Sequence, residues 1–156
     1  MRNDLIIQHG ITDKQIEQLI HLTKTDEHIH AHTHDRKRFA SIEAFKDWRK
    51  KKRDIFVLTD PTNELLGLIW FSKKTIPDHI SADDFETTFA IRIYQKVRGK
   101  KLSYFFMKHS FEKMGVSKAW LSVKKTNQVA INLYTKFGFR KQKNIGESTI
   151  MTYERH

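Results

Sequence analysis

Seven segments of the chain carry the short runs of aliphatic, aromatic and β-branched residues that are typical of β-strands. Residues 55–59 and 65–71 flank the turn residues 60–63, so they predict an antiparallel hairpin. Residues 87–94 form another clear strand, which ends shortly before Gly99. The strands are expected at residues 5–8, 55–59, 65–71, 87–94, 119–123, 139–143 and 148–153.

Four further segments repeat their apolar residues with the period of a helix. Thr12 and Gln15 have the spacing of a capping box, which predicts a helix start, and Gly115 and Gly138 predict the ends of two later helices. A polar, histidine-rich connection is expected between the first helix and the second. The helices are expected from Thr12, from about Ser41, from about Lys100 to Met114 and from Asn127 to Phe137.

The predicted order of these elements is β-α-α-β-β-β-α-β-α-β-β, without an internal repeat or a linker. It predicts an α/β (α+β) fold in which four helices flank a central, mixed, seven-stranded sheet. The chain of 156 residues has the usual length of one domain, so we expect residues 1–156 to form a single domain.

The composition makes the chain strongly basic. Lys and Arg number 29 against 18 Asp and Glu, and the net charge of +11 favours phosphate-bearing ligands, nucleic acid or an acidic membrane as partners. The absence of Cys excludes disulfides, thiolate nucleophiles and thiolate metal sites. No apolar run has the length of a signal peptide or a membrane span, so we expect a cytoplasmic protein without membrane contact.

The segment 96–103 joins a predicted strand to a predicted helix through Gly99 and carries four cations in its first six residues. Free N–H groups at a helix start, the helix dipole and the close approach that glycine permits can together hold a phosphate. An ordinary basic turn between a strand and a helix has the same composition. The pattern alone therefore leaves both interpretations open.

The segment 127–139 carries a more specific pattern. An Asn opens the predicted helix, an Ala follows three residues later, Leu-Tyr lies near the helix end, and Lys-Phe-Gly-Phe closes the segment. This pattern resembles the second signature of the GNAT superfamily of N-acetyltransferases. The first signature of that family, Gln/Arg-x-x-Gly-x-Gly/Ala, is similar to the segment 96–101, which departs from it at Lys96 and Lys101.

The resemblance implies the GNAT fold and acetyl-coenzyme A as cosubstrate, bound where the strands at 87–94 and 119–123 splay apart. The pantetheine arm would pair with exposed backbone as an added strand does, and the diphosphate would lie on the amides of the basic turn. The cofactor-binding residues implied in this way are Ile91, Ile93, Arg98, Gly99, Lys100, Lys101, Leu102, Ser103 and Asn127.

Two residues are candidates for proton transfer. By the resemblance, Tyr134 lies near the sulfur and protonates the departing thiolate, although a packed helical Tyr would have the same spacing. Many family members carry a Glu as general base on the strand before the basic turn, but the matching positions here, Thr88 and Ala90, cannot titrate. The candidate base is Glu86, the last of the three upstream acids Asp83, Asp84 and Glu86.

Two charged clusters are open to more than one interpretation. His28, His30, His32 and His34 would lie on one side of an extended segment, but without an interleaved acid they favour a solvated loop over a metal site. A pH-sensitive rim of the acceptor pocket is a further alternative. The charge run 49–53 suits the C-terminal end of a helix, so we interpret it as a solvated helix end and not as a nucleic-acid site.

The sequence therefore predicts an N-acetyltransferase that moves the acetyl group of acetyl-coenzyme A to a primary amine. Direct attack in a ternary complex is expected, because the chain has no Cys and no Ser in a nucleophile context. The alternative is a non-catalytic module of the same fold that uses its basic surface for nucleic acid or another polyanion. The acceptor stays open among small-molecule and protein amines, and we expect a monomer or a homodimer.

Overall fold

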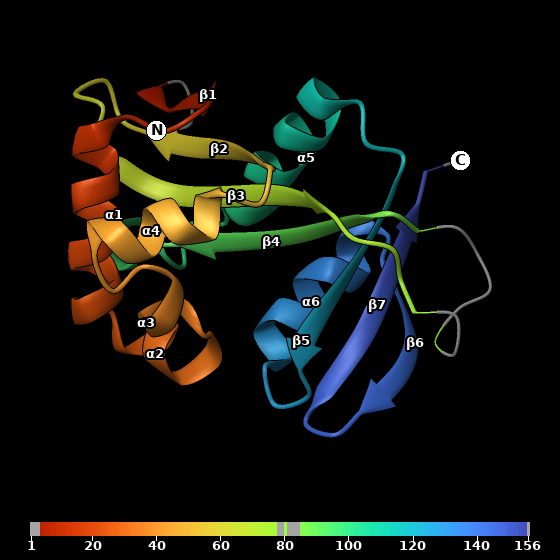
Figure 1. The fold of residues 1–156 in the computed structure, drawn as a ribbon. Helices are drawn as coiled ribbons and strands as arrows, with labels where there is room; N and C mark the ends of the chain where they lie inside the picture. The colour runs from red at the N-terminus through yellow and green to blue at the C-terminus, as the bar shows by residue number, and fades with distance from the viewer. Residues whose placement is uncertain (1–3, 78–79, 81–84, 156) are drawn as a thin grey trace.

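A seven-stranded mixed sheet forms the centre of the computed structural model, which describes residues 4–77, 80 and 85–155 (Figure 1). Its strands lie in the order β1-β2-β3-β4-β5-β7-β6, which confirms the predicted sheet. The elements are β1 (Ile6–His9), α1 (Asp13–Thr25), α2 (Glu27–His32), α3 (Asp35–Arg38), α4 (Ile42–Arg49), β2 (Arg53–Thr59), β3 (Leu65–Lys73), β4 (Thr87–Ile93), the 3-10 helix η2 (Gln95–Val97), α5 (Ser103–Met114), β5 (Lys118–Lys124), α6 (Gln128–Phe137), β6 (Arg140–Ile145) and β7 (Ser148–Glu154).

The described residues form six α-helices, two more than the sequence predicts. The additional helices, α2 and α3, occupy the histidine-rich segment that the sequence predicts as a loop. Helix α2 follows Asp26, whose Oδ1 accepts hydrogen bonds from the N–H groups of His28 at 3.1 Å and Ile29 at 3.3 Å. This cap and the burial of Ile29 in the core stabilise a short helix whose polar residues hide the helical period.

The other helix ends follow the signals in the sequence. Thr12 Oγ1 accepts from the N–H of Gln15 at 3.1 Å, and Gln15 Oε1 accepts from the N–H of Thr12 at 2.9 Å, which completes the capping box of α1. Ser41 Oγ caps α4 by accepting from the N–H of Ala44 at 3.1 Å. Gly115 ends α5 with φ 65°, a conformation that glycine adopts without steric cost. No helix in the described part of the chain has the length and hydrophobicity needed to cross a membrane.

The two faces of the sheet belong to different hydrophobic clusters. One cluster joins side chains of α1, α2 and α4 to the face that carries Trp70 and, at its margin, Ala90. The other joins side chains of α5 and α6 to the opposite face and includes Phe89 and Ile91. Because side chains alternate along a strand, β4 contributes to both clusters. Helices α1 to α4 therefore lie across the sheet from α5 and α6 (Figure 1).

Candidate functional site

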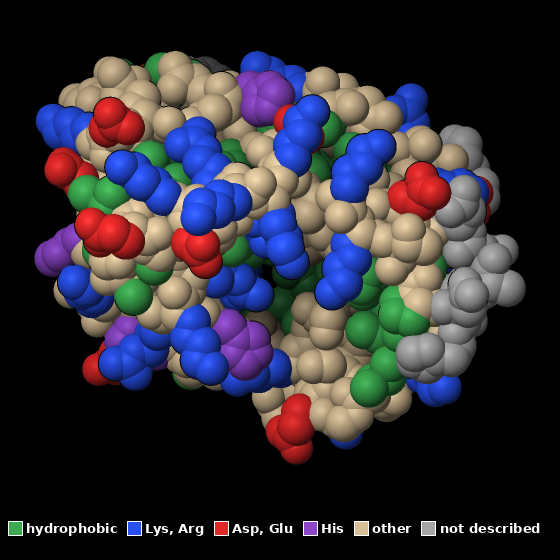
Figure 2. Space-filling model, viewed as in Figure 1, with side chains coloured by type: hydrophobic (Ala, Val, Ile, Leu, Met, Phe, Trp, Pro, Cys, Tyr) green, Lys and Arg blue, Asp and Glu red, His purple; other side chains and the backbone are tan. Residues whose placement is uncertain are grey.

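A cleft opens where the parallel strands β4 and β5 separate. Thr88 and Trp120 form their one backbone pair among the described residues, and beyond this pair the strands diverge. The cleft has a volume of about 1290 Å³, which exceeds the roughly 300–1,000 Å³ that is common for small-molecule sites. Figure 2 shows it as a hollow near the middle of this face, with Lys and Arg side chains gathered around it. We take this cleft as the candidate active site.

The edge of β4 that faces β5 presents backbone groups to the cleft. The N–H of Tyr94 donates to Leu66 O in β3 at 3.0 Å. Because backbone groups alternate in direction along a strand, the N–H and C=O groups of Ile91 and Ile93 point to the other edge, toward β5. Both residues also line the cleft. They are the two that the resemblance assigns to the pantetheine arm.

The turn after β4 carries the predicted phosphate segment into α5, which begins at Ser103, three residues later than predicted. Gly99 has φ 83°, and a Cβ added there would meet no heavy atom within 4 Å, so its backbone is open to a ligand. Lys101 has φ 59°, in the left-handed region that costs a residue with a side chain about 1–2 kcal/mol. Gly99, Lys101, Leu102 and Ser103 line the cleft, whereas Lys100 is exposed and does not line it.

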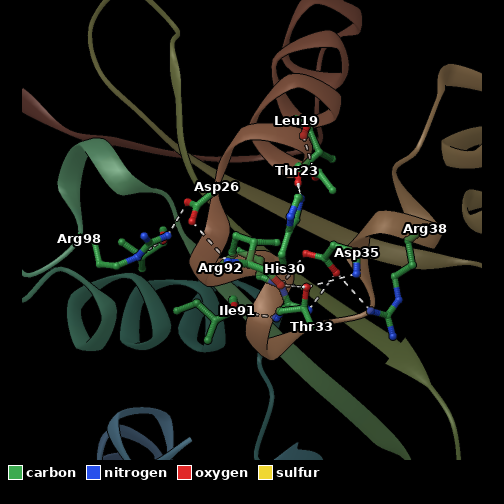
Figure 3. Close-up of polar contacts among 12 residues, drawn as sticks. Leu19, Thr23, Asp26, His30, Thr33, Asp35, Arg38, Ile91, Arg92 and Arg98 are labelled. Carbon is green, nitrogen blue, oxygen red and sulfur yellow. Dashed lines mark hydrogen bonds and ion pairs between the residues drawn. The ribbon is translucent and has the colours of Figure 1, made fainter.

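The guanidinium of Arg98, at the start of that segment, points toward helix α2 (Figure 3). Its Nη2 lies 2.5 Å from Asp26 Oδ2 and donates to Ile93 O at 2.9 Å. Burial would raise the pKa of the Asp26 carboxyl, but the hydrogen bond and charge of Arg98, with the N–H groups of Ile29 and His28, lower it. Arg98 therefore ties α2 to the turn, and its charge is balanced by a carboxylate of the protein.

Helix α6 brings Asn127 and Tyr134 to the cleft. Asn127 Oδ1 accepts from the N–H of Ala130 at 3.2 Å and so caps α6, which leaves its Nδ2 group to donate. Tyr134 is buried, and its ring centroid lies 6.2 Å from that of Phe89 and 5.7 Å from that of Phe139. Burial raises the pKa of the Tyr134 phenol, so the group keeps its proton at neutral pH.

The structure does not bring Glu86 into the cleft. Its side chain is exposed, and the residue is absent from the described lining. Thr88 and Ala90 do line the cleft, with small neutral side chains at the positions where many relatives are expected to carry a Glu. The other upstream acids, Asp83 and Asp84, lie outside the described residues.

A buried carboxylate that the sequence analysis missed lies beside the cleft (Figure 3). Asp35 is fully buried; its Oδ2 lies 2.7 Å from Arg92 Nε, and its Oδ1 lies 3.0 Å from Arg92 Nη2 and 3.2 Å from Arg38 Nη1. Burial disfavours the charge on Arg92, but Asp35 outweighs this effect and raises the pKa of Arg92. No local pattern signals the pair, because Asp35 and Arg92 are 57 residues apart in the sequence.

Two tryptophans, also missed in the sequence analysis, line the cleft near α4. The rings of Trp48 and Trp70 meet edge to face, with centroids 5.2 Å apart. Arg53 lies over Trp48 at 4.3 Å and Arg38 lies over Trp70 at 5.8 Å, each measured from the guanidinium carbon to the ring centroid. Arg53 Nη1 donates to Trp48 O, while Arg53 Nε is buried and has no hydrogen-bond partner in the described part of the chain. Burial and the charge of Arg38 lower the pKa of Arg53.

The histidines of α2 reach the cleft from a helix, so the favoured interpretation of this segment as a solvated loop is wrong, and the extended arrangement does not form. His28 and His32 lie one turn apart, with ring centroids separated by 4.5 Å, and both line the cleft. His30 points elsewhere and bonds to Thr23 O through Nε2 (Figure 3). Burial, Arg98 and His32 lower the pKa of His28. Within the described residues, no group of three or more His, Cys, Asp or Glu could hold a metal ion.

The model of the acetyltransferase (GNAT) family matches residues 16–139, which include both signature segments. The chain belongs to the GNAT family of acetyltransferases. It is therefore an acyltransferase whose cosubstrate is acetyl-coenzyme A, as the resemblance predicts. No curated protein sequence shows a significant match to the chain.

Solved structures share the fold at low sequence identity. Spermidine N-acetyltransferase from Vibrio cholerae, in complex with coenzyme A and spermine, has a TM-score of 0.73 and 17% identity over 98% of this chain and 96% of that chain. A dodecameric structure of the same enzyme has a TM-score of 0.70 and 16% identity over 98% of this chain and 95% of that chain. A structure provisionally assigned as a phosphinothricin N-acetyltransferase has a TM-score of 0.73 and 14% identity, with coverage of 97% and 99%. These similarities concern the fold, so the acceptor must be inferred from this chain's own residues.

Proposed function

We propose that this enzyme transfers the acetyl group of acetyl-coenzyme A to a primary amine by direct attack in a ternary complex. The observation that carries the proposal is the cleft between β4 and β5, which both signature segments line and which has room for two ligands together. The chain contains no Cys that could carry a covalent acetyl group. Direct transfer of the acetyl group between the two bound substrates is therefore proposed, without a covalent acetyl-enzyme.

The residues of the cleft fit acetyl-coenzyme A as a ligand. The N–H groups of Ile91 and Ile93 would bond the pantetheine arm as a neighbouring strand does. The open backbone at Gly99 and the first turn of α5, which begins at Ser103, suit the diphosphate. Asn127 keeps a donor for the same ligand after its oxygen has capped α6. Each of these residues lines the cleft.

Acetyl transfer forms a bond from the amine nitrogen to the carbonyl carbon and breaks the bond from that carbon to sulfur, which leaves with the electron pair. Tyr134 would protonate this thiolate, because it lines the cleft and its raised pKa keeps the phenolic proton in place until it is needed. Solvent would then return a proton to the phenolate. The N–H donors on the edge of β4 would stabilise the charge that develops on the carbonyl oxygen.

The acceptor ammonium must lose a proton before it attacks, and the cleft favours this loss in two ways. Its Lys and Arg side chains disfavour a further positive charge, which lowers the pKa of a bound ammonium. His28 lines the cleft, and its lowered pKa keeps the imidazole neutral and able to accept a proton. That Glu86 is the general base remains a prediction, which Glu86→Gln tests. Unchanged turnover would mean that a group in the cleft accepts the proton of the ammonium, whereas a large loss of turnover would mean that Glu86 accepts it.

The proposal is tested by titration of coenzyme A in a calorimeter and by thiol release from acetyl-coenzyme A in the presence of amines. A ligand that binds only the folded state stabilises it by about 2.7 kcal/mol at a hundredfold excess over Kd, so saturating cofactor should raise Tm measurably. Thiol release should depend on both the protein and the amine. Absence of heat and of any rise in Tm with saturating coenzyme A would contradict the proposal.

A further inference from the structure

The described lining of the cleft contains no Asp and no Glu. Apart from its histidines, the charged side chains of this lining are all Lys or Arg. Asp26 and Asp35, which contact Arg98 and Arg92 of the lining, are buried. A cleft of this kind favours ligands that carry negative charge. Its Lys and Arg residues are Arg38, Arg53, Lys74, Arg92, Arg98, Lys101, Lys108, Lys124 and Lys136.

The register of the sheet places part of this charge on the face opposite α5 and α6. Arg53 pairs with Ser72, and Ser72 pairs with Thr88, so these three side chains form one row on the same face. Two residues along the strands, Trp70 pairs with Ala90 in the next row of that face. The tryptophan belongs to the cluster under α1, α2 and α4, so Arg53 lies on the side of the sheet that these helices cover.

The floor of this region is made of small, neutral side chains. Ser72, Thr88 and Ala90 all line the cleft, and none of them carries a charge. Trp48 and Trp70, whose rings meet edge to face, line the same cleft. A compact ligand at the floor would therefore lie beside Thr88 and Ala90, the strand positions that the resemblance associates with the general base.

The protein balances the charge of Arg38 and Arg53 only in part. Arg38 shares the single carboxylate of Asp35 with Arg92, which takes the shorter contacts at 2.7 and 3.0 Å. Arg53 has no carboxylate partner among the described residues, and its Nε is buried without an acceptor. Arg38 and Arg53 thus add positive charge at one end of the cleft and leave at least one donor for a ligand.

This end of the cleft is distinct from the turn that suits the cofactor phosphates. Five residues of extended strand separate Thr88, in the row of Arg53, from Ile93, where the turn begins. At about 3.3 Å per residue, this separation is about 17 Å. The phosphates at the turn therefore cannot also neutralise Arg53.

We propose that the acceptor is a small amine that also carries an anionic oxygen group, which Arg38 and Arg53 bind while Trp48 and Trp70 cover the body of the molecule. This inference rests on the proposed function, because it concerns the second substrate of the same cleft. Two guanidinium forks match the oxygens of a carboxylate or a phosphate, and both groups are chemically acceptable here. A polyamine would instead bring further positive charge to a cleft that has no described carboxylate to receive it.

The test compares amines that differ by the anionic group alone. Phenylalanine is paired with phenethylamine and β-alanine with ethylamine for the carboxylate, and phosphoethanolamine is paired with ethanolamine for the phosphate. Spermidine represents a polycation. Thiol release gives kcat/KM, and calorimetry with coenzyme A present gives binding independently of turnover. We expect at least one anionic member to exceed its partner by about tenfold or more, since charge-assisted hydrogen bonds are the strong ones.

Substitutions then assign the preference to the two arginines. Arg38→Gln and Arg53→Gln should each lower kcat/KM for the preferred anionic amine by about tenfold to a hundredfold, mainly through KM, and leave its uncharged partner unaffected. Arg53→Lys keeps the charge but loses the fork, so it should restore part of the loss. Arg49→Gln is the matched control, because Arg49 is exposed and does not line the cleft.

Equal or better use of spermidine or of the uncharged partners would overturn the inference while thiol release upheld the proposed function. Absence of binding by every anionic amine, with coenzyme A still bound, would overturn it in the same way. Losses in the arginine variants that are equal for both members of a pair would also overturn it, since they would report damage to the fold. Failure to bind coenzyme A at all would instead remove the proposed function.

Discussion

The ion pair between Asp26 and Arg98 tests how helix α2 is held against the cofactor turn. The side chain of Asp26 is 3% exposed and that of Arg98 is 29% exposed. Asp26→Asn keeps the size of the side chain and its capping oxygen but removes the charge, whereas Asp26→Ala removes the cap as well. Asp47→Asn is a suitable control, because Asp47 is 80% exposed and lies 3.4 Å from Lys50 in a surface pair.

The expected losses follow from the contacts of Asp26. A hydrogen bond to a charged group contributes about 1.5–3 kcal/mol and a neutral one about 0.5–1.5 kcal/mol, so Asp26→Asn should lose about 1–1.5 kcal/mol. Asp26→Ala also loses the cap, about 1 kcal/mol, and the remaining bond, which brings the loss to about 3 kcal/mol. At about 2–4 °C per kcal/mol for a chain of this size, Tm should fall by about 2–6 °C and about 6–12 °C, respectively.

The pH dependence gives a second, independent readout. The pKa of Asp26 is lowered in the folded state, so its ion pair stabilises the fold above the ordinary carboxyl value of 3.8 and is lost as pH falls through the folded value. Asp26→Asn cannot titrate at this position, so its deficit should shrink in acid. Urea unfolding near neutral pH and in acid measures this. Equal midpoints for wild type and Asp26→Asn at neutral pH, or a deficit that stays constant in acid, would refute the reasoning.

Three further changes have definite expected results. Tyr134→Phe should lower kcat by about a hundredfold with little change in cofactor affinity, and Tyr153→Phe, a residue outside the described cleft lining, should leave kcat unchanged. Lys101→Gly removes the cost of the left-handed backbone at this residue, but it also removes a cation from the turn. Cofactor affinity should therefore fall, and fall most at low salt. Tighter binding would contradict a contribution of the Lys101 charge to cofactor binding. Asp35→Asn leaves Arg92 without its carboxylate and should destabilise the fold by about 3 kcal/mol or more in urea unfolding, which an unchanged midpoint would disprove.

Local signals in the sequence determined most of the elements correctly. The capping box at Thr12, the cap at Ser41 and the stop at Gly115 each depend on residues within four positions of one another, so a local pattern contains them. The segment of α2 also has a local cap, Asp26, but its polar residues hide the helical period, and one buried residue, Ile29, is its main contact with the core. The burial of Ile29 and the contact of Asp26 with Arg98 are tertiary interactions, which a local pattern does not contain.

In the candidate site, too, some residues belong to local sequence patterns and others are brought together only by the fold. The residues that suit the cofactor lie in two short signature segments, so resemblance could locate Gly99 and Tyr134 by number alone. The acceptor end is built from α3, α4, the start of β2, the end of β3 and the start of β4, which only the folded chain brings together. Arg38 and Arg53 belong to clusters of cations in the sequence, and nothing local distinguishes them from the exposed members Arg36 and Lys51.

The pairing of charges in the fold, more than the net charge, indicates which cations meet a ligand. Arg92 and Arg98 are balanced by buried carboxylates, so they shape the cleft without adding a free charge to it. Arg53 has no carboxylate partner in the described residues, and Arg38 has only a share of one, so this region favours a bound molecule that carries negative charge. In the proposed function, the signatures specify the anion at the turn before α5; in the inference on the acceptor, the rows of β2, β3 and β4 specify the anion at the other end of the cleft. A chain with the same signatures and different residues in those rows should therefore bind the same cosubstrate and take a different acceptor.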